Sequence, residues 1–162
     1  MDAATKTNRV MERKLKNIFT QGAITAAFIA DSIAKHSSKT TIGGHSIFLG
    51  QVRADVIDEK KVTAIEYSTY EELALEKMHV IREETFAKYE LTCMHVHHSL
   101  GAVAAGEICL FVFTSSAHRR AAIDACNEVV ERIKTELPVW GKEIISGGTG
   151  REDETHQWKV NQ

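Results

Sequence analysis

The sequence SAHRR places three basic side chains, His118, Arg119 and Arg120, directly before a long apolar helical pattern. We expect Ser116 to cap this helix with its hydroxyl. The basic residues then lie in the first turn, where positive charge opposes the helix dipole and costs roughly 0.3–1 kcal/mol per charge. A bound phosphate or carboxylate would reverse this effect, because free N–H groups and two guanidinium groups could hold it. Alternatively, the arginines pair with surface carboxylates such as Asp124, and the residues alone leave both interpretations open.

Three further cations lie where strands and helices are expected to end. Arg53 closes a predicted strand shortly after Gly50, a residue that indicates a bulge or a close backbone approach. Lys134 and Lys142 flank a helix-to-strand corner that contains Pro138. A partly buried lysine near other cations loses its proton more easily, which suits nucleophilic or proton-transfer chemistry. For each of these cations the alternative is an ordinary solvated surface charge.

Cys93, His95 and His97 alternate along a predicted strand and so share one face, with His98 on the other. This set could bind zinc if a fourth ligand approached, and a small metallo-hydrolase would be the corresponding function. The alternative is that these side chains are core or interface residues, because strand spacing produces such sets by coincidence. We favour the second interpretation and expect neither a metal nor a cofactor.

Composition limits the possible partners and compartments. The chain has 162 residues, of which 43% are hydrophobic and 26% charged, and its net charge is −2. These values are typical of a globular protein and give no global attraction to nucleic acid or to membranes. The longest apolar run, from Ile108 to Phe113, is too short to span a bilayer, and the polar N-terminus lacks the apolar stretch of a signal peptide. Three cysteines without CxxC spacing indicate the reducing cytoplasm.

Apolar periodicity predicts helices and strands that mix without regular βαβ alternation. The predicted helices cover about residues 23–36, 71–89 and 116–137, and the predicted strands 45–53, 61–67, 91–98, 108–114 and 139–145. A turn is expected at 58–60 and a glycine-containing loop at 99–106. The pattern favours a single α+β domain over residues 1–162, with a largely antiparallel sheet and helices packed on one face. Residues 1–17 and 146–162 are predicted to be a flexible arm and tail, the latter docked by Trp158.

Five blocks of the sequence together resemble one known family. They are FLGQVR (48–53), EYSTYEELALEKM (66–78), HHSLG (97–101), SSAHRRAAIDAC (115–126) and KTELPVW-x-KE (134–143). In this order they resemble the catalytic, large subunits of molybdopterin synthase, the MoaE family. The resemblance implies an α/β hammerhead-type fold and a homodimer within a heterotetramer.

The resemblance also implies a sulfurtransferase that acts in molybdenum cofactor biosynthesis. Each active site would receive the C-terminal tail of a small ubiquitin-like sulfur-carrier subunit, which ends in Gly-Gly bearing a thiocarboxylate. Two sulfurs would pass from this tail to cyclic pyranopterin monophosphate, which gives molybdopterin. By position in the matching blocks, the implied substrate-binding residues are Arg53, His118 and Arg119, and the implied catalytic residues are Lys134 and Lys142.

The chain departs from the family pattern at one position of the expected site. The family usually has a lysine directly after the tryptophan of its P-x-W motif, whereas this sequence has Gly141 and then Lys142. Neighbouring strand residues point to opposite faces, so Lys142 reaches the pocket only if Gly141 forms a bulge. Otherwise the enzyme relies on Lys134 alone, or the chain is an impaired dimeric module that binds the carrier tail or a phosphorylated ligand.

Overall fold

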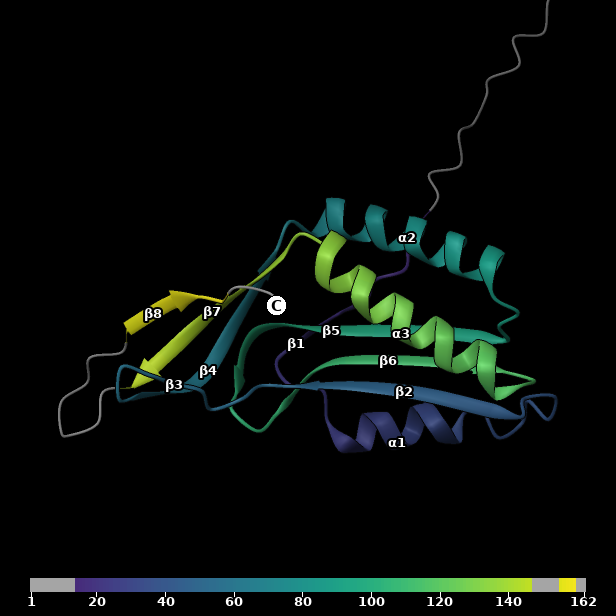
Figure 1. Cartoon of the computed structure of the whole chain (residues 1–162), viewed down its shortest axis with the longest axis horizontal. Coiled ribbons are helices and arrows are strands. Elements are labelled where there is room, and N and C mark those ends of the chain that lie inside the picture. Colours follow the sequence, from purple (N-terminus) through teal and green to yellow (C-terminus); the bar gives the residue numbers. More distant parts are fainter. Residues whose placement is uncertain (1–13, 147–154, 160–162) are drawn as a thin grey trace, which may run out of the picture.

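The computed structural model describes residues 14–146 and 155–159, which form three helices and an eight-stranded sheet (Figure 1). In chain order the elements are β1 (Phe19–Gln21), α1 (Ala26–Ala34), β2 (Gly44–Gln51), β3 (Val56–Ile57), β4 (Lys60–Thr69), α2 (Glu71–Lys88), β5 (Cys93–Ala104), β6 (Ile108–Ser116), α3 (Arg119–Glu136), β7 (Val139–Ser146) and β8 (Thr155–Trp158). None of the helices in these residues is long and apolar enough to cross a membrane.

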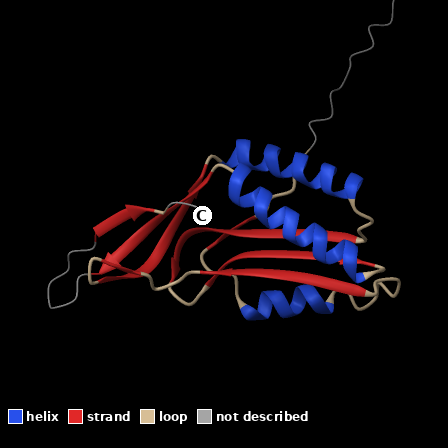
Figure 2. Cartoon of the chain, viewed as in Figure 1, coloured by secondary structure: helices blue, strands red, loops and turns tan. Residues whose placement is uncertain are grey.

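The sheet follows the order β2-β6-β5-β4-β7-β8, and every neighbouring pair on this path is antiparallel. Strand β1 adds a parallel pairing with β5, and β3 pairs with β4. The predicted α+β domain with a largely antiparallel sheet is therefore confirmed. Strands β4, β7 and β8 project beyond the helices, as Figure 2 shows, and β2 forms the opposite edge of the sheet.

The two long helices lie together on one face of the sheet, while α1 lies against the other (Figure 1). Side chains of β6 alternate between these layers: Leu110 and Val112 join the main core, and Phe111 and Phe113 form a second cluster with Ile24. The prediction of helices on one face thus holds for α2 and α3 and needs correction for α1. All six residues of the run 108–113 are apolar because both faces of β6 are covered.

Helix α3 follows the apolar pattern closely. The predicted stripe is buried against the sheet along its whole length: Ala122, Cys126, Val129, Ile133 and Leu137. Leu137 is the C-cap, and Pro138 follows because its ring cannot continue the helix. The last turn of α3 therefore lies at a defined place beside the start of β7, and this turn carries Lys134.

Two parts of the chain differ from the sequence prediction. The segment 99–104, predicted as a loop, continues strand β5, which pairs with β6 as far as His98 and with β4 from Gly101 onward. Gly101 has a φ of +77°, which lets the strand change direction between its two partners. Residues 155–158 of the predicted tail form β8 on the outer edge of β7. Residues 147–154 and 160–162 of the predicted tail, and residues 1–13 of the predicted arm, lie outside the described residues.

Candidate active site

A cleft of about 690 Å³ opens between the end of β2, the C-terminal half of α3 and the β7–β8 pair. Its apolar walls include Phe48, Leu49 and Trp158. Six charged residues also line it: Arg53, Lys134 and Lys159 are basic, and Asp55, Glu131 and Glu143 are acidic. Within the described residues, one chain thus gives the cleft as many cations as carboxylates.

The cleft brings together two of the predicted site residues, Arg53 and Lys134. Arg53 follows β2, whose register with β6 shifts between Gly50 and Gln51. The unpaired residue at this shift is Cys109 of β6, and a Cβ at Gly50 would lie 3.2 Å from Leu110 Cβ, so of the two predicted alternatives Gly50 itself shows the close approach. The Arg53 side chain is 72% exposed and donates to Asp55 Oδ2 at 3.2 Å. The guanidinium therefore stands at the mouth of the cleft, with one carboxylate beside it.

Lys159 is a site residue that the sequence patterns did not suggest. Its backbone N–H donates to the carbonyl of Gly141 at 2.7 Å, directly after β8. Lys159 lines the cleft, and together with Lys134 and Gly141 it also lines a smaller cavity of about 30 Å³. Lys134 and Lys159 therefore both lie beside Gly141, the position at which the sequence comparison predicted a lysine.

Lys142 is not among the residues that line either cavity. Its neighbours Gly141 and Glu143 each line one of them, as expected when successive strand residues alternate between faces. The register of β7 with β4 is regular from Ile144 to Val139, so no bulge at Gly141 turns Lys142 toward the cleft. The structure therefore separates Lys142 from the other predicted catalytic residue, Lys134.

The side chains of Tyr67 and His98, which line the small cavity with Lys134 and Lys159, stay uncharged near pH 7. Burial raises the pKa of Tyr67 well above its ordinary value, and the neighbouring Cys109 thiol adds to the shift, so the phenol keeps its proton. Burial lowers the pKa of His98 to about 4, and the charge of Lys134 acts in the same direction. His98 Nδ1 lies 2.8 Å from the carbonyl oxygen of Ser99, which can only accept, so Nδ1 carries the proton of this neutral ring.

The other two predicted site residues, His118 and Arg119, lie at the far end of α3. His118 is the N-cap residue and Arg119 the first helical residue, so fifteen steps along α3 place Arg119 about 22 Å from Lys134. Both side chains are exposed, and neither is paired with a carboxylate among the described residues. Within one chain they do not share the cleft with Arg53 and Lys134.

The start of α3 also differs from the predicted capping arrangement. Ser116 is the last residue of β6 and is buried, and its hydroxyl donates to the His118 carbonyl instead of accepting from the helix. The helix has no side-chain cap and no acidic residue in its first turn. Arg120 is 3.8 Å from Asp124, so the surface ion pair expected as the alternative is present for Arg120. The first-turn N–H groups and the Arg119 guanidinium remain available to an anion.

Comparison with known proteins identifies the family. The model of the family described as MoaE protein matches residues 22–136, which include Arg53, His118, Arg119 and Lys134. The chain belongs to the MoaE protein family. The resemblance inferred from the five sequence blocks is therefore confirmed. Lys142 and Lys159 lie beyond the matched residues.

Two relatives from distant organisms have the same name. The molybdopterin synthase catalytic subunit of Pyrococcus abyssi is 36% identical over 120 residues, which are 74% of this chain and 80% of that protein. The protein of the same name from Drosophila willistoni is also 36% identical over 120 residues, but these are only 31% of its length. The chain therefore spans less than a third of that longer relative.

Solved structures of MoaE relatives share the fold. Molybdopterin synthase from Staphylococcus aureus superposes with a TM-score of 0.72 at 26% identity and covers 88% of this chain and 95% of that chain. A complex of subunits 1 and 2 of molybdopterin-converting factor from Helicobacter pylori matches with a TM-score of 0.67 at 19% identity, over 77% of this chain and 82% of that chain. The second likeness concerns the fold alone.

Proposed function

We propose that this chain is the catalytic subunit of a molybdopterin synthase, a cytoplasmic sulfurtransferase of molybdenum cofactor biosynthesis. Its substrates are then cyclic pyranopterin monophosphate and the thiocarboxylated tail of a small ubiquitin-like carrier subunit. The observation that carries the proposal is the cleft in which Arg53 and Lys134, which match the family's site, lie together. The names of the MoaE relatives and of the Staphylococcus aureus structure support it.

The chemistry of a thiocarboxylate defines what the cleft has to provide. A thiocarboxylate that gives up its sulfur ends as a carboxylate, so water must add to its carbonyl carbon, and the carbonyl oxygen gains negative charge. Ammonium groups beside this carbon stabilise the charge, and both Lys134 and Lys159 line the cleft. The exposed guanidinium of Arg53 is suited to hold the pterin phosphate through two parallel hydrogen bonds. This chemistry needs no cofactor.

We assign the role of the second lysine to Lys159 and not to Lys142. Lys159 lies against Gly141, because its backbone N–H donates to the Gly141 carbonyl and both residues line the small cavity. A lysine at position 141 would project from β7 beside this cavity. Lys159, directly after β8, lines the same cavity and can therefore supply an ammonium to the same part of the site. The neutral rings of Tyr67 and His98 border this cavity and add no charge that would compete with either lysine.

The equal number of cations and carboxylates in the cleft indicates that one chain is not the complete site. The cyclic phosphate diester and the thiocarboxylate each carry one negative charge, and the lining offers them no excess of positive charge. His118 and Arg119, which have no carboxylate partner among the described residues, would supply that excess if a second copy placed them over the cleft.

Strand β2 has the geometry that such a second copy needs. It is an edge strand, and its residues Ile47, Phe48 and Leu49 are between 37% and 41% exposed, although they are large and apolar. A Cβ on Gly44, at the start of β2, would lie 3.2 Å from Arg119 Cα, whereas Arg53 follows the end of the same strand.

A two-fold axis at the middle of β2 exchanges the two ends of the strand. Seven steps from Gly44 to Gln51 span about 23 Å, which matches the separation of about 22 Å between Arg119 and Lys134 along α3. Such a homodimer would therefore bring the His118–Arg119 end of each copy to the cleft of the other. Each dimer would contain two sites, and each site would bind one carrier tail.

The function is tested by a reconstituted synthesis assay. Purified protein is mixed with thiocarboxylated carrier and cyclic pyranopterin monophosphate, and molybdopterin is measured together with the fraction of carrier returned as carboxylate. Two carriers should be consumed for each molybdopterin formed. A protein that binds the carrier tail but forms no product would contradict the proposal and support the second candidate, an impaired binding module.

The homodimer is tested separately by sedimentation. Ile47→Asp places a charge at the middle of the β2 edge without changing a residue that lines the cleft, so the variant should sediment as a monomer and lose activity. Val80→Asp, at another exposed apolar residue on α2, is the matched control and should remain dimeric. An Ile47→Asp protein that stays dimeric would remove β2 as the contact while leaving the sulfurtransferase assignment untouched.

A further inference from the structure

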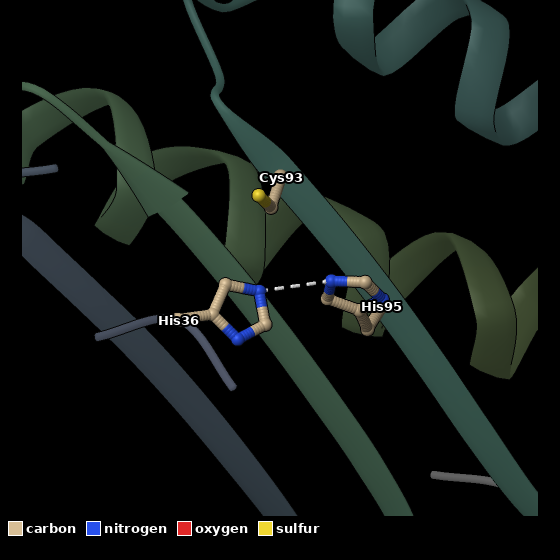
Figure 3. A group of neighbouring side chains, drawn as sticks. All are labelled: His36, Cys93 and His95. Atoms are coloured by element: carbon tan, nitrogen blue, oxygen red, sulfur yellow. Dashed lines mark hydrogen bonds between the residues drawn. The ribbon is translucent and has the colours of Figure 1, made fainter. Parts of the chain in front are cut away.

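A second group of chemically capable side chains lies on the face of the sheet that α1 covers. His36 follows α1, and Cys93 and His95 lie on β5; one ligand atom from each lies within 4.8 Å of the other two (Figure 3). His97, which the sequence pattern placed with this pair, is instead stacked on Phe111 at 5.8 Å and meets the edge of Phe28. The fold therefore exchanges His97 for His36 in the set.

The orientation of His36 is fixed by a hydrogen bond typical of metal-binding histidines. Its Nδ1 lies 2.7 Å from the carbonyl oxygen of Ser32, one turn earlier in α1. Because a carbonyl only accepts, Nδ1 carries the proton and Nε2 of the neutral ring is left with its lone pair. That Nε2 points at His95 Nε2, 3.0 Å away, as the dashed line in Figure 3 shows. A carbonyl that fixes tautomer and ring orientation in this way is the usual support of a histidine ligand.

Two of the three donors are buried, and one contact restricts access to the sulfur. Cys93 and His36 are only 5% and 7% exposed. In the hydrogen bond between the two rings His36 Nε2 accepts and His95 Nε2 donates, so a bound ion would take the place of that one proton. Lys39 Nζ donates to Cys93 Sγ at 2.9 Å, but this lysine is exposed and can turn into solvent, which opens one approach to the sulfur.

We propose that His36, Cys93 and His95 form a binding site for a zinc ion, with water as the fourth ligand on the side from which Lys39 withdraws. One thiolate and two imidazoles are donors that zinc prefers, and three protein ligands plus one water complete its tetrahedron. The ion would link the end of α1 to β5, so its first effect is to hold α1 on the sheet. This site replaces our expectation from the sequence that the chain holds no metal, and it is independent of the sulfurtransferase assignment.

The site is tested on the full-length protein after treatment with a chelator. Zinc is added and the bound ion counted, and cobalt(II) is added separately because a cobalt–thiolate bond gives a charge-transfer band in the near ultraviolet. Wild type should bind about one ion per chain and show the band. Cys93→Ala should lose the band and bind zinc at least about tenfold more weakly, because the one thiolate is gone.

Cys126→Ala is the matched control, because Cys126 is equally buried but lies in the main core. It should retain both the zinc and the cobalt band. His95→Ala gives a second variant in case Cys93→Ala folds poorly, and zinc should raise the melting temperature of wild type and Cys126→Ala only. Wild type without the cobalt band, or Cys93→Ala with unchanged zinc affinity, would show that the three side chains form only a hydrogen-bonded cluster.

Discussion

The two ends of helix α3 differ in charge and in their surroundings. At the C-terminal end, Lys134 lies in a cleft with Arg53 and Lys159, but three carboxylates balance these cations. At the N-terminal end, His118 and Arg119 are exposed without a carboxylate partner among the described residues, but neither lines the cleft. One end has a cavity without excess charge, and the other has charge without a cavity. A two-fold partner would bring the two ends together.

The largest effect is expected at the cleft end, from Lys134→Ala. Lys134 lines both the cleft and the small cavity, so its ammonium is the group best placed to stabilise a developing oxyanion. Removing one such donor typically lowers turnover by about 100-fold or more. We expect this loss in kcat for molybdopterin formation, with the melting temperature little changed. Lys77→Ala, at an exposed lysine on α2, is the matched control and should keep full activity. Full activity in Lys134→Ala would remove this residue from the mechanism.

A smaller effect is expected at the other end, from Arg119→Ala. Losing a charge-assisted hydrogen bond to the pterin phosphate should raise KM by about tenfold to 100-fold, with a smaller change in kcat. Arg120→Ala is the control, because Arg120 already pairs with Asp124 on the surface, and should change KM little.

Mixing the two impaired variants, at a pterin concentration well below the KM of Arg119→Ala, tests whether the two ends belong to different copies. In a dimer of one Lys134→Ala chain and one Arg119→Ala chain, one site loses both residues and the other keeps both. Random mixing should therefore restore about a quarter of wild-type activity, because half of the dimers are mixed and each has one intact site. If the two ends acted within one chain, every site would lack one residue, and no activity above that of the separate variants would return.

An effect of about tenfold is expected for Lys159→Met, which removes the ammonium next to Gly141 and keeps much of the side-chain volume. Lys142→Met makes the same chemical change one residue after Gly141, on the face of β7 that lines neither cavity, and should alter kcat by less than about twofold. The comparison of kcat for these two variants decides which lysine serves the site. The reverse ranking would return the catalytic role to Lys142.

The parts of this site that the sequence predicts are those set by local pattern. The apolar stripe of α3 and Pro138 place Lys134, and Gly50 marks the end of β2, shortly before Arg53. Lys159 escapes such prediction because β8 is four residues long, THQW, and has no apolar alternation. The segment THQW forms a strand because it pairs with the edge of β7.

Tertiary contacts likewise decide two other features that local pattern leaves open. Cys93 and His95 share a strand face, as predicted, but the sequence does not show that the chain after α1 returns to place His36 beside them. Similarly, Ser116 has the residue type of a helix cap. It is used instead as the buried end of β6, because its register with Gly44 extends the β2–β6 pairing. Both outcomes depend on partners far away in the chain.

The smallest effect on activity, and a clear effect on stability, is expected from Gly141→Lys, which restores the family's usual residue. A Cβ at this position would lie 3.0 Å from Ile65 Cγ2 and 3.3 Å from Tyr67 Cε1, and Ile65 is fully buried. Crowding of this kind typically costs about 1–3 kcal/mol in the free energy of unfolding. The melting temperature should therefore fall while molybdopterin formation does not rise, because Lys159 already supplies the ammonium. Gly141→Ala adds only the crowding carbon and should account for most of the lost stability. A large gain in turnover from Gly141→Lys, absent from Gly141→Ala, would mean that the site lacks a lysine and that Lys159 does not replace it.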